Sequence, residues 1–163
     1  MKELKVALQA AKSAGEIIMK YYRSNYEVKD KSPNNPVTTA DLEANKEIQE
    51  IIMDNFPDDG WLSEETKDSS ERLTKPRVWI IDPIDGTKEF IEGVSQFAVS
   101  IALVENGNPI VGVLHNPATG EVFNAVADGG AFCGGRLIKC IGCDDLKRAS
   151  ALVSRTEKKR GML

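Results

Sequence analysis

Residues 79–90 read WIIDPIDGTKEF, so that two carboxylates stand three residues apart where an apolar run ends. Asp82 and Asp85 can converge if the chain turns here, and the carbonyl oxygen of Ile84 can point the same way. Three oxygens in one place suit a hard cation, above all Mg²⁺, which takes few protein ligands and keeps water for its substrate. The segment therefore predicts a Mg²⁺ site.

Residues on either side of this segment extend the predicted site. Gly86 lets the backbone approach closely, and Thr87 opens a predicted helix whose free N–H groups can face a phosphate. Glu64 and Glu65 follow another predicted strand and can lie beside the turn if the two strands are neighbours. Carboxylates packed so closely repel one another and raise at least one pKa unless cations neutralise them. Two or three Mg²⁺ ions would bridge a phosphate ester and activate a water.

Each acidic residue also has an ordinary structural explanation when it is taken alone. Asp-Pro opens many turns, and Asp-Gly closes many. Glu64 and Glu65 are typical of a solvated loop end. Asp41 lies in the first turn of a predicted helix, where a carboxylate is favoured by the helix dipole. Only the combination of the motifs favours the functional interpretation.

The three motifs occur together in a known family. Residues 36–41 (PVTTAD), 63–65 (SEE) and 79–87 (WIIDPIDGT) resemble, in order and approximate spacing, the lithium-sensitive, Mg²⁺-dependent phosphomonoesterases that include inositol monophosphatase. Residues 87–90 (TKEF) are similar to the 3′(2′),5′-bisphosphate nucleotidases, whereas inositol monophosphatases typically continue Thr-Thr-Asn-Phe. The resemblance extends from residue 1 to about 156.

This resemblance implies a set of metal ligands. Glu64 and Asp82 would bind one ion together with the carbonyl oxygen of Ile84. Asp82 and Asp85 would share the next ion, so that Asp82 bridges. Lys31, in the segment before the second predicted helix, is expected near a further metal.

The resemblance also implies catalytic and phosphate-binding residues. Asp41 and Thr87 would form a hydrogen-bonded pair that orients the attacking water and helps to deprotonate it, beside the metal-bound Glu64. The backbone N–H groups of Gly86 and Thr87 would hold the phosphate. Glu65 is expected as a neighbour of this site.

The implied activity is removal of the 3′-phosphate of adenosine 3′,5′-bisphosphate, or of its sulfated form, by a metal-activated water. The alternative substrate is inositol 1-phosphate or another sugar phosphate. An alternative of another class is a non-catalytic module that binds metal or a partner. For the phosphatase, the expected binding partner is the small phosphate ester that serves as its substrate.

Helices precede strands in the predicted order of elements. Leu4, Leu8 and Ile18 recur at helical spacing within a helix predicted over 2–24, and a loop is expected over 30–39. Thr38 or Thr39 can cap a second helix that reaches Phe56. The inner face of that helix is expected to carry the following apolar residues: Leu42, Ile48, Ile51, Ile52 and Phe56.

Strands fill most of the remaining sequence. A hairpin is predicted around ENGNP, residues 105–109, between strands 97–104 and 110–115. The other predicted elements are strands at 60–62, 78–81 and 121–127, a short helix at 88–92 and the beginning of a strand in SALVS, residues 150–154. Two helices followed by a mostly antiparallel meander predict an α+β fold. The resemblance implies the N-terminal half of the αβαβα sandwich of the sugar phosphatases.

The family continues into a second α/β domain with a Trp-Asp-x-Ala-Ala-type motif, which has no match in this sequence. We therefore expect residues 1–156 to form a metal-binding phosphatase domain and residues 157–163 to begin a missing C-terminal domain. Such a half would expose a sheet edge and an apolar face, so we expect it to self-associate as a homo-oligomer.

Composition limits the other possibilities. The net charge of -4 argues against binding to a nucleic-acid polymer. We find no signal peptide and no apolar run of the ~20 residues that a bilayer requires, so a cytoplasmic protein without membrane contact is expected. Cys133, Cys140 and Cys143 predict reduced thiols. A zinc site with His115 is not favoured, because no second Cys pair exists.

Overall fold

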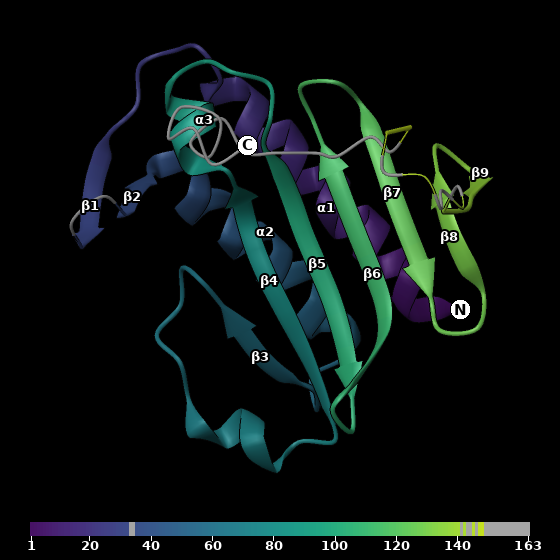
Figure 1. Cartoon of the computed structure of the whole chain (residues 1–163). Helices are drawn as coiled ribbons and strands as arrows, with labels where there is room; N and C mark the ends of the chain where they lie inside the picture. The colour runs from purple at the N-terminus through teal and green to yellow at the C-terminus, as the bar shows by residue number, and fades with distance from the viewer. Residues whose placement is uncertain (33–34, 141, 143–144, 146, 149–163) are drawn as a thin grey trace.

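The computed structural model of the chain describes residues 1–32, 35–140, 142, 145, 147 and 148. Helices α1 and α2 lie on one side of a large sheet, and the short α3 lies at one end of it (Figure 1). This arrangement confirms the predicted α+β class. In chain order the elements are α1 Lys2–Tyr21, β1 Val28–Ser32, β2 Asn35–Thr38, α2 Thr39–Asn55, β3 Gly60–Ser63, the 3-10 turn η1 Ser70–Thr74, β4 Arg77–Asp85, α3 Thr87–Ile91, β5 Ala98–Glu105, β6 Asn108–Asn116, β7 Glu121–Val126, β8 Gly130–Cys133 and β9 Arg136–Ile138.

The helix α2 begins at a capping box and buries a row of residues spaced four apart. The backbone N–H of Asp41 donates to the Thr38 hydroxyl, and the Asp41 carboxylate accepts from the Thr38 backbone N–H. The prediction of Leu42 in the buried face is wrong, because its side chain is 48% exposed. Leu42 lies two residues from Ala40, which places it on the opposite side of the helix. The fully buried row on α2 is Ala40, Ala44, Ile48 and Ile52.

The predicted loop over 30–39 contains a small antiparallel sheet instead. Strands β1 and β2 pair with Val28 opposite Thr38 and Asp30 opposite Pro36. Pro36 has no N–H to donate, but a two-stranded sheet consists only of edge strands, where proline is tolerated. The pairing directs β2 straight into the start of α2, and it brings the end of β1 near the turn after β3.

The main sheet has seven strands in the order β3-β4-β5-β6-β7-β8-β9. Strands β3 and β4 are parallel, and every other neighbouring pair is antiparallel, so the predicted mostly antiparallel meander is confirmed. The predicted hairpin joins β5 to β6 through Asn106 and Gly107, which have φ of 49° and 82°. Two consecutive residues with positive φ are what a tight turn between twisted strands requires.

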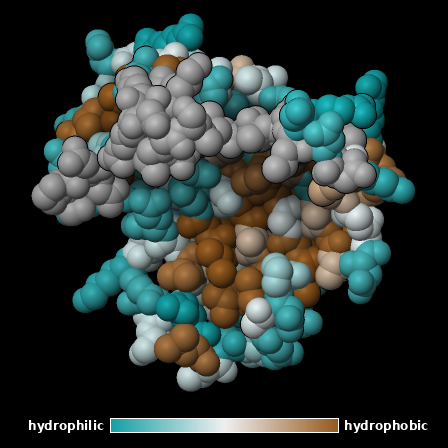
Figure 2. Space-filling view, in the orientation of Figure 1, coloured by the Kyte–Doolittle hydropathy of each residue, from teal (hydrophilic) through white to brown (hydrophobic). Residues whose placement is uncertain are grey.

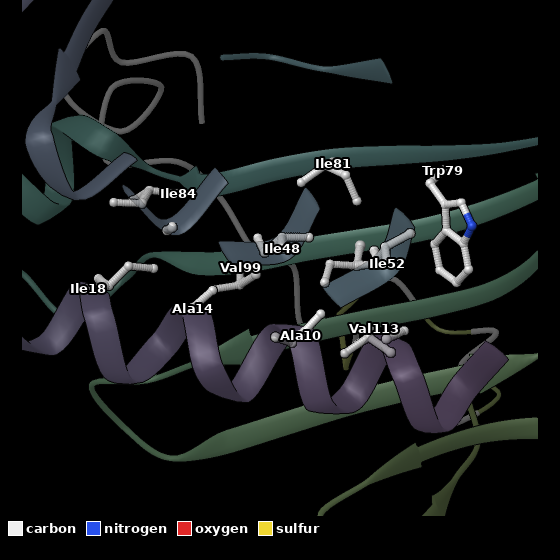
Figure 3. Close-up of a cluster of buried hydrophobic side chains, with 14 of the residues drawn as sticks. Ala10, Ala14, Ile18, Ile48, Ile52, Trp79, Ile81, Ile84, Val99 and Val113 are labelled. Atoms are coloured by element: carbon white, nitrogen blue, oxygen red, sulfur yellow. The ribbon is translucent and has the colours of Figure 1, made fainter. Parts of the chain in front are cut away.

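The hydrophobic core lies between the two long helices and one face of this sheet (Figure 3). Trp79 is fully buried, and its indole N–H donates to Asp59 at 2.9 Å. Every second residue of the central strands points into this layer, as the period of a strand requires. The buried sheet residues are Trp79, Ile81, Val99, Ile101, Leu103, Val111 and Val113.

The opposite face of the sheet, which we call the front face, is apolar and is not covered by α1 or α2 (Figure 2). Ile80, Leu114 and Phe123 are 40%, 44% and 38% exposed on it. Small residues lie opposite one another across four strands, as Ala102, Gly112, Ala125 and Ala131. They line a shallow hollow of about 340 Å³.

None of the described helices is long and apolar enough to cross a membrane. The predicted strand at 150–154 lies outside the described residues.

Candidate metal centre

The parallel pairing of β3 with β4 brings the two acidic motifs together. Ser63 lies opposite Ile81 in the register, so the residues that follow them, Glu64 and Asp82, are neighbours. The backbone N–H of Glu64 donates to the carbonyl of Ile81 at 3.2 Å and continues the pairing beyond β3. Since the ends of parallel strands meet at one edge of a sheet, two motifs far apart in sequence share one place.

An irregularity in β4 turns Asp82 and Asp85 toward the same side. The prediction that the strand ends at residue 81 is wrong, because β4 continues to Asp85. Asp82 lies opposite Ser100 and Asp85 opposite Ala98, so three steps along β4 correspond to two along β5. The extra residue is a bulge, and it cancels the alternation that would place residues three apart on opposite faces.

These residues line one cavity of about 220 Å³ at the end of the sheet. The cavity lies where the chain passes from β4 through Gly86 into α3. It therefore joins the metal-ligand candidates with the candidate phosphate-binding residues. The lining residues are Pro36, Glu64, Asp82, Ile84, Asp85, Gly86, Thr87, Lys88 and Glu89.

The crowding of carboxylates perturbs the ionisation of Asp82. Burial, together with the negative charges of Glu64 and Asp85, raises the pKa of Asp82 from 3.8 to about 7. A hydrogen bond of 3.1 Å from the backbone N–H of Ile84 to Asp82 Oδ1 acts in the opposite direction and is outweighed. The site thus disfavours a full set of negative charges unless a cation is present.

Lys31 supplies one positive charge next to this cluster. Its ammonium donates to Glu64 Oε1 at 2.8 Å and to Glu65 Oε1 at 2.7 Å. Partial burial acts to lower the pKa of Lys31, but the bonds to the two glutamates outweigh it and the pKa is raised. Burial also raises the pKa of Glu65, and Lys31 offsets this effect only in part. Glu65 is therefore held against Lys31 and does not line the cavity.

Asp41 contacts both the start of its own helix, at Thr38, and Thr87 beside the cavity. Its side chain is 1% exposed, and its Oδ2 accepts from the Thr38 backbone at 2.7 Å. Its Oδ1 accepts from the Thr87 hydroxyl, which lies 3.1 Å away and also 3.0 Å from the carbonyl oxygen of Ile84. Burial raises the pKa of Asp41, although the hydrogen bonds from Thr38 and Thr87 oppose this. The expected Asp41–Thr87 hydrogen bond is thus present, beneath the cavity.

Glycine is required at position 86. Gly86 has φ of 99°, a conformation that L side chains rarely adopt, and an added Cβ would lie 2.9 Å from the carbonyl oxygen of Gln96. This close approach lets β4 turn directly into α3. Binding of a phosphate by the N–H groups of Gly86 and Thr87 stays a prediction.

The donor atoms at this place fit a hard divalent cation. Among the described residues, no three His, Cys, Asp or Glu side chains surround a single point as they stand. Glu64 instead turns one oxygen to the Lys31 ammonium. The available donors are nevertheless carboxylates of Glu64, Asp82 and Asp85 with the Ile84 carbonyl, which are the ligands that Mg²⁺ takes. Burial and then repulsion from Glu64 and Asp85 raise the pKa of Asp82, and such a cation would offset both effects.

His115, Cys133 and Cys140 do not line this cavity. His115 on β6 places Nδ1 3.0 Å from the carbonyl oxygen of Ala11, and so ties the sheet to α1. Cys133 and Cys140 are free thiols. Cys143 lies outside the described residues.

Asn45 also belongs to this region, although it was not predicted from the sequence. Asn45 is buried on α2 and hydrogen bonds to Ser63 and Thr66, on both sides of the two glutamates. Its signal in the sequence is its position four residues after Asp41, which predicts the same face of the helix.

Comparison with known proteins agrees with the sequence motifs. The sequence pattern of the inositol monophosphatase family matches residues 2–161. The chain is 41% identical, over 82% of its length, to a histidinol-phosphatase of Chlorobaculum parvum, of which it covers 51%. It is 38% identical, over 91% of its length, to the 3′(2′),5′-bisphosphate nucleotidase CysQ of Escherichia coli, of which it covers 61%.

Solved structures share the fold as well. The extragenic suppressor protein SuhB of Bartonella henselae aligns with 84% of the chain at a TM-score of 0.80 and 35% identity. The aligned part is 54% of that protein. The chain thus spans between about half and three fifths of the length of these relatives. The names of the histidinol-phosphatase and the bisphosphate nucleotidase indicate different substrates.

Proposed function

The chain belongs to the inositol monophosphatase family, and from this premise we propose that it is the metal-binding half of a Mg²⁺-dependent phosphomonoesterase. The observation that supports this proposal is the convergence of Glu64, Asp82 and Asp85 in one cavity next to the Asp41–Thr87 pair. No single residue of this set requires a catalytic function. Their assembly at the ends of β3 and β4 and the starts of α2 and α3 brings three carboxylates next to a hydrogen-bonded Asp–Thr pair, which supports the proposal.

The proposed ligands divide between two ions. Glu64, Asp82 and the Ile84 carbonyl would hold one, and Asp82 with Asp85 would hold the other. Bound Mg²⁺ would supply a lowered pKa for a coordinated water and compensation for the charge on the phosphate. Lys31 is the counter-charge that Glu64 contacts without metal, through Glu64 Oε1 alone, so the proposed metal contact can use the second carboxylate oxygen of Glu64.

Thr87 and Asp41 orient the attacking water in this proposal. The Thr87 hydroxyl donates to Asp41, so a lone pair of the Thr87 oxygen remains available to accept a proton from water in the cavity. Asp41 is fixed by Thr38 on its other oxygen and cannot turn away. Its buried carboxylate has a raised pKa, which makes it a better acceptor for a proton passed through Thr87.

For the substrate we propose adenosine 3′,5′-bisphosphate, with its sulfated form as a related substrate. The support is the sequence Lys88-Glu89 after the Gly86-Thr87 turn, which resembles the nucleotidases, and the similarity to CysQ. Lys88 and Glu89 both line the cavity, where they can contact the group attached to the phosphate.

A second substrate class has its own supporting observation. A further cavity of about 390 Å³ shares Asp85, Gly86 and Glu89 with the first and extends to Glu121. The carboxylates of Asp85, Glu89 and Glu121 would repel a second phosphate, whereas they can accept hydrogen bonds from hydroxyl or ammonium groups. A sugar phosphate such as inositol 1-phosphate, or an amino alcohol phosphate, is therefore the alternative.

The experiment measures phosphate release with Mg²⁺ from adenosine 3′,5′-bisphosphate, inositol 1-phosphate and histidinol phosphate. It uses the chain alone and the full product of its gene. Preference for the nucleotide supports the first assignment, and a clear preference for either other substrate rejects it. Absence of release from all three by the full gene product would reject the phosphatase function.

The alternative of another class is a module that binds a partner through its apolar front face. The exposed side chains of Ile80, Leu114 and Phe123 support it, because contiguous apolar surface of this kind marks an interface. Cytoplasmic location remains part of the proposal and is checked by cell fractionation.

A further inference from the structure

The two glutamates of the site stand on a short turn just beyond the end of β3. Ser63 is the last residue of β3 that pairs with β4, and the backbone N–H of Glu64 continues the pairing by donating to Ile81 at 3.2 Å. Within the turn, the Thr66 N–H donates to the Ser63 carbonyl at 3.4 Å, which is long for such a bond. The direction in which Glu64 points must therefore depend on side-chain contacts.

Lys31 binds the two carboxylates themselves, and from the neighbouring helix Asn45 holds the turn that carries them. Its side chain is buried, with 7% exposure. The Asn45 Oδ1 accepts from the Ser63 hydroxyl at 2.5 Å, and Nδ2 donates to the Thr66 hydroxyl at 3.0 Å. The Ser63 oxygen in turn accepts from the backbone N–H of Glu65 at 3.2 Å. One amide thus holds both ends of the turn, before and after the two glutamates.

The same helix face carries Asp41. Asp41 and Asn45 are four residues apart on α2, so they project from one side of the helix, one turn apart. Asp41 accepts from Thr87 at the start of α3, while Asn45 binds the turn after β3. The helix therefore fixes the glutamate turn relative to the Asp41–Thr87 pair.

We propose that Asn45 is a positioning residue for the metal centre, which sets the geometry of Glu64 by clamping the turn 63–66 to α2. This inference rests on the proposed function, because it concerns how the proposed metal ligand is held. The Asn45 amide supplies an acceptor for the Ser63 hydroxyl and a donor to the Thr66 hydroxyl. Aspartate could accept from both hydroxyls but would bury a negative charge beside the two glutamates, and leucine would leave both hydroxyls without this partner.

The first measurement is the response of the full chain to Mg²⁺. Thermal melts over a range of Mg²⁺ concentrations give the concentration for half of the maximal stabilisation. We expect Asn45→Ala to raise this concentration by ~10-fold to 100-fold, the range for residues that orient metal ligands. Ser63→Ala removes the same hydrogen bond from the other side and should act in the same direction. It also provides a second variant if Asn45→Ala does not fold.

Ile48→Val is the matched control. Ile48 is fully buried one turn further along α2, and it has no hydrogen bond to the turn. Its substitution removes a buried methylene and destabilises the helix packing. It should lower the melting temperature and leave the Mg²⁺ midpoint unchanged. An equal shift of the midpoint in this control would attribute the effect to general loss of stability and overturn the proposal.

A second measurement needs no metal. Hydrogen–deuterium exchange reports the Glu65 N–H, which donates to Ser63. We expect faster exchange at this amide in Asn45→Ala than in the unmutated chain or Ile48→Val. Unchanged exchange, or an unchanged Mg²⁺ midpoint, overturns the role of Asn45. A lack of any Mg²⁺ response in the unmutated chain overturns the metal site instead and the positioning role with it, so the two failures are distinguishable.

Discussion

The substitution Asp82→Asn tests whether the crowded carboxylates destabilise the metal-free protein and whether they bind Mg²⁺. Asp82→Asn keeps the shape of the side chain and its acceptor oxygen for the Ile84 N–H, but it cannot carry a negative charge. In the metal-free protein the substitution removes the cost of burying the Asp82 charge and its repulsion with Glu64 and Asp85. With Mg²⁺ it removes the carboxylate proposed to bridge two ions. The two conditions therefore give effects of opposite sign.

The size of the metal-free effect follows from the pKa of Asp82. A rise from 3.8 to about 7 corresponds to ~4 kcal/mol, at ~1.4 kcal/mol for each unit of pKa. Because Asp82 is only half-buried, solvent screening reduces this to on the order of 2 kcal/mol. At ~2–4 °C for each kcal/mol in a chain of this size, Asp82→Asn should melt about 4–8 °C higher at pH 8 without metal.

The pH dependence fixes the sign. The folded-state pKa of Asp82 lies above its unfolded value, so the folded metal-free protein binds the proton more tightly. The stability contributed by protonated Asp82 is fully present below about pH 4 and is lost as the pH rises through about 7. Asp82→Asn lacks this loss. The difference in melting temperature between the two proteins should therefore grow from pH 4 to pH 8.

The assay compares melts of both proteins in a chelator and in saturating Mg²⁺, with Asp54→Asn as the control at an exposed position on α2. A ligand present at 100 times its dissociation constant stabilises by ~2.7 kcal/mol, and Asp82→Asn should lose most of this gain. Phosphatase activity of the full gene product should fall at least ~10²-fold. Equal Mg²⁺ shifts in the two proteins would show that Asp82 is not a ligand. A pH-independent difference would refute the raised pKa of Asp82.

Other substitutions test further parts of the structure. Lys31→Ala removes the ammonium between the two glutamates, so we expect a lower metal-free melting temperature and a larger stabilisation by Mg²⁺; a smaller stabilisation would instead make Lys31 part of the metal-binding arrangement. Thr87→Val keeps the side-chain shape but leaves Asp41 Oδ1 without this donor, so unfolding in urea should show a loss of ~1–3 kcal/mol together with reduced turnover; full turnover would exclude Thr87 from the water relay. Gly15→Ala would place a Cβ 2.6 Å from His115 Cε1 and should cost about 1–3 kcal/mol in the same urea assay, whereas an unchanged unfolding midpoint would mean that α1 and β6 separate easily. Phe123→Lys adds a charge to the exposed apolar front face, so light scattering should show self-association of the unmutated chain and less of it in the variant; a stable monomer of the unmutated chain at high concentration would contradict the expected homo-oligomer.

The sequence alone identified features that depend on local spacing. The amphipathic repeat in α1, a cap at Thr38 or Thr39, of which the structure uses Thr38, and the Asn106–Gly107 turn each follow from residues within a few positions of one another. The candidate ligands were also found in this way, since Asp82 and Asp85 belong to one short motif that resembles a known family. Patterns of this kind are determined by the period of an element and by allowed φ values.

Sequence reasoning failed where a partner outside the segment decides the conformation. Residues 30–39 have the composition of a loop, but β1 and β2 pair with each other and bring Lys31 to Glu64. Leu42 is apolar, yet it faces solvent because the small side chains of Ala40 and Ala44 form the buried face of α2. Neither outcome follows from the local pattern. The first depends on the pairing of two strands, and the second depends on which side of α2 packs against the core.

The site itself was decided by tertiary structure. Asp82 and Asp85 face the same side only because β5 opposes three steps of β4 with two of its own. Glu64 joins them only because β3 pairs with β4 in parallel, and Asn45 reaches the turn only because α2 packs against this part of the sheet. The sequence determined which oxygens are available, since their chemistry is local. Their convergence required strand register and helix packing, because carboxylates that repel one another are brought together only by the burial of the apolar layer beneath them.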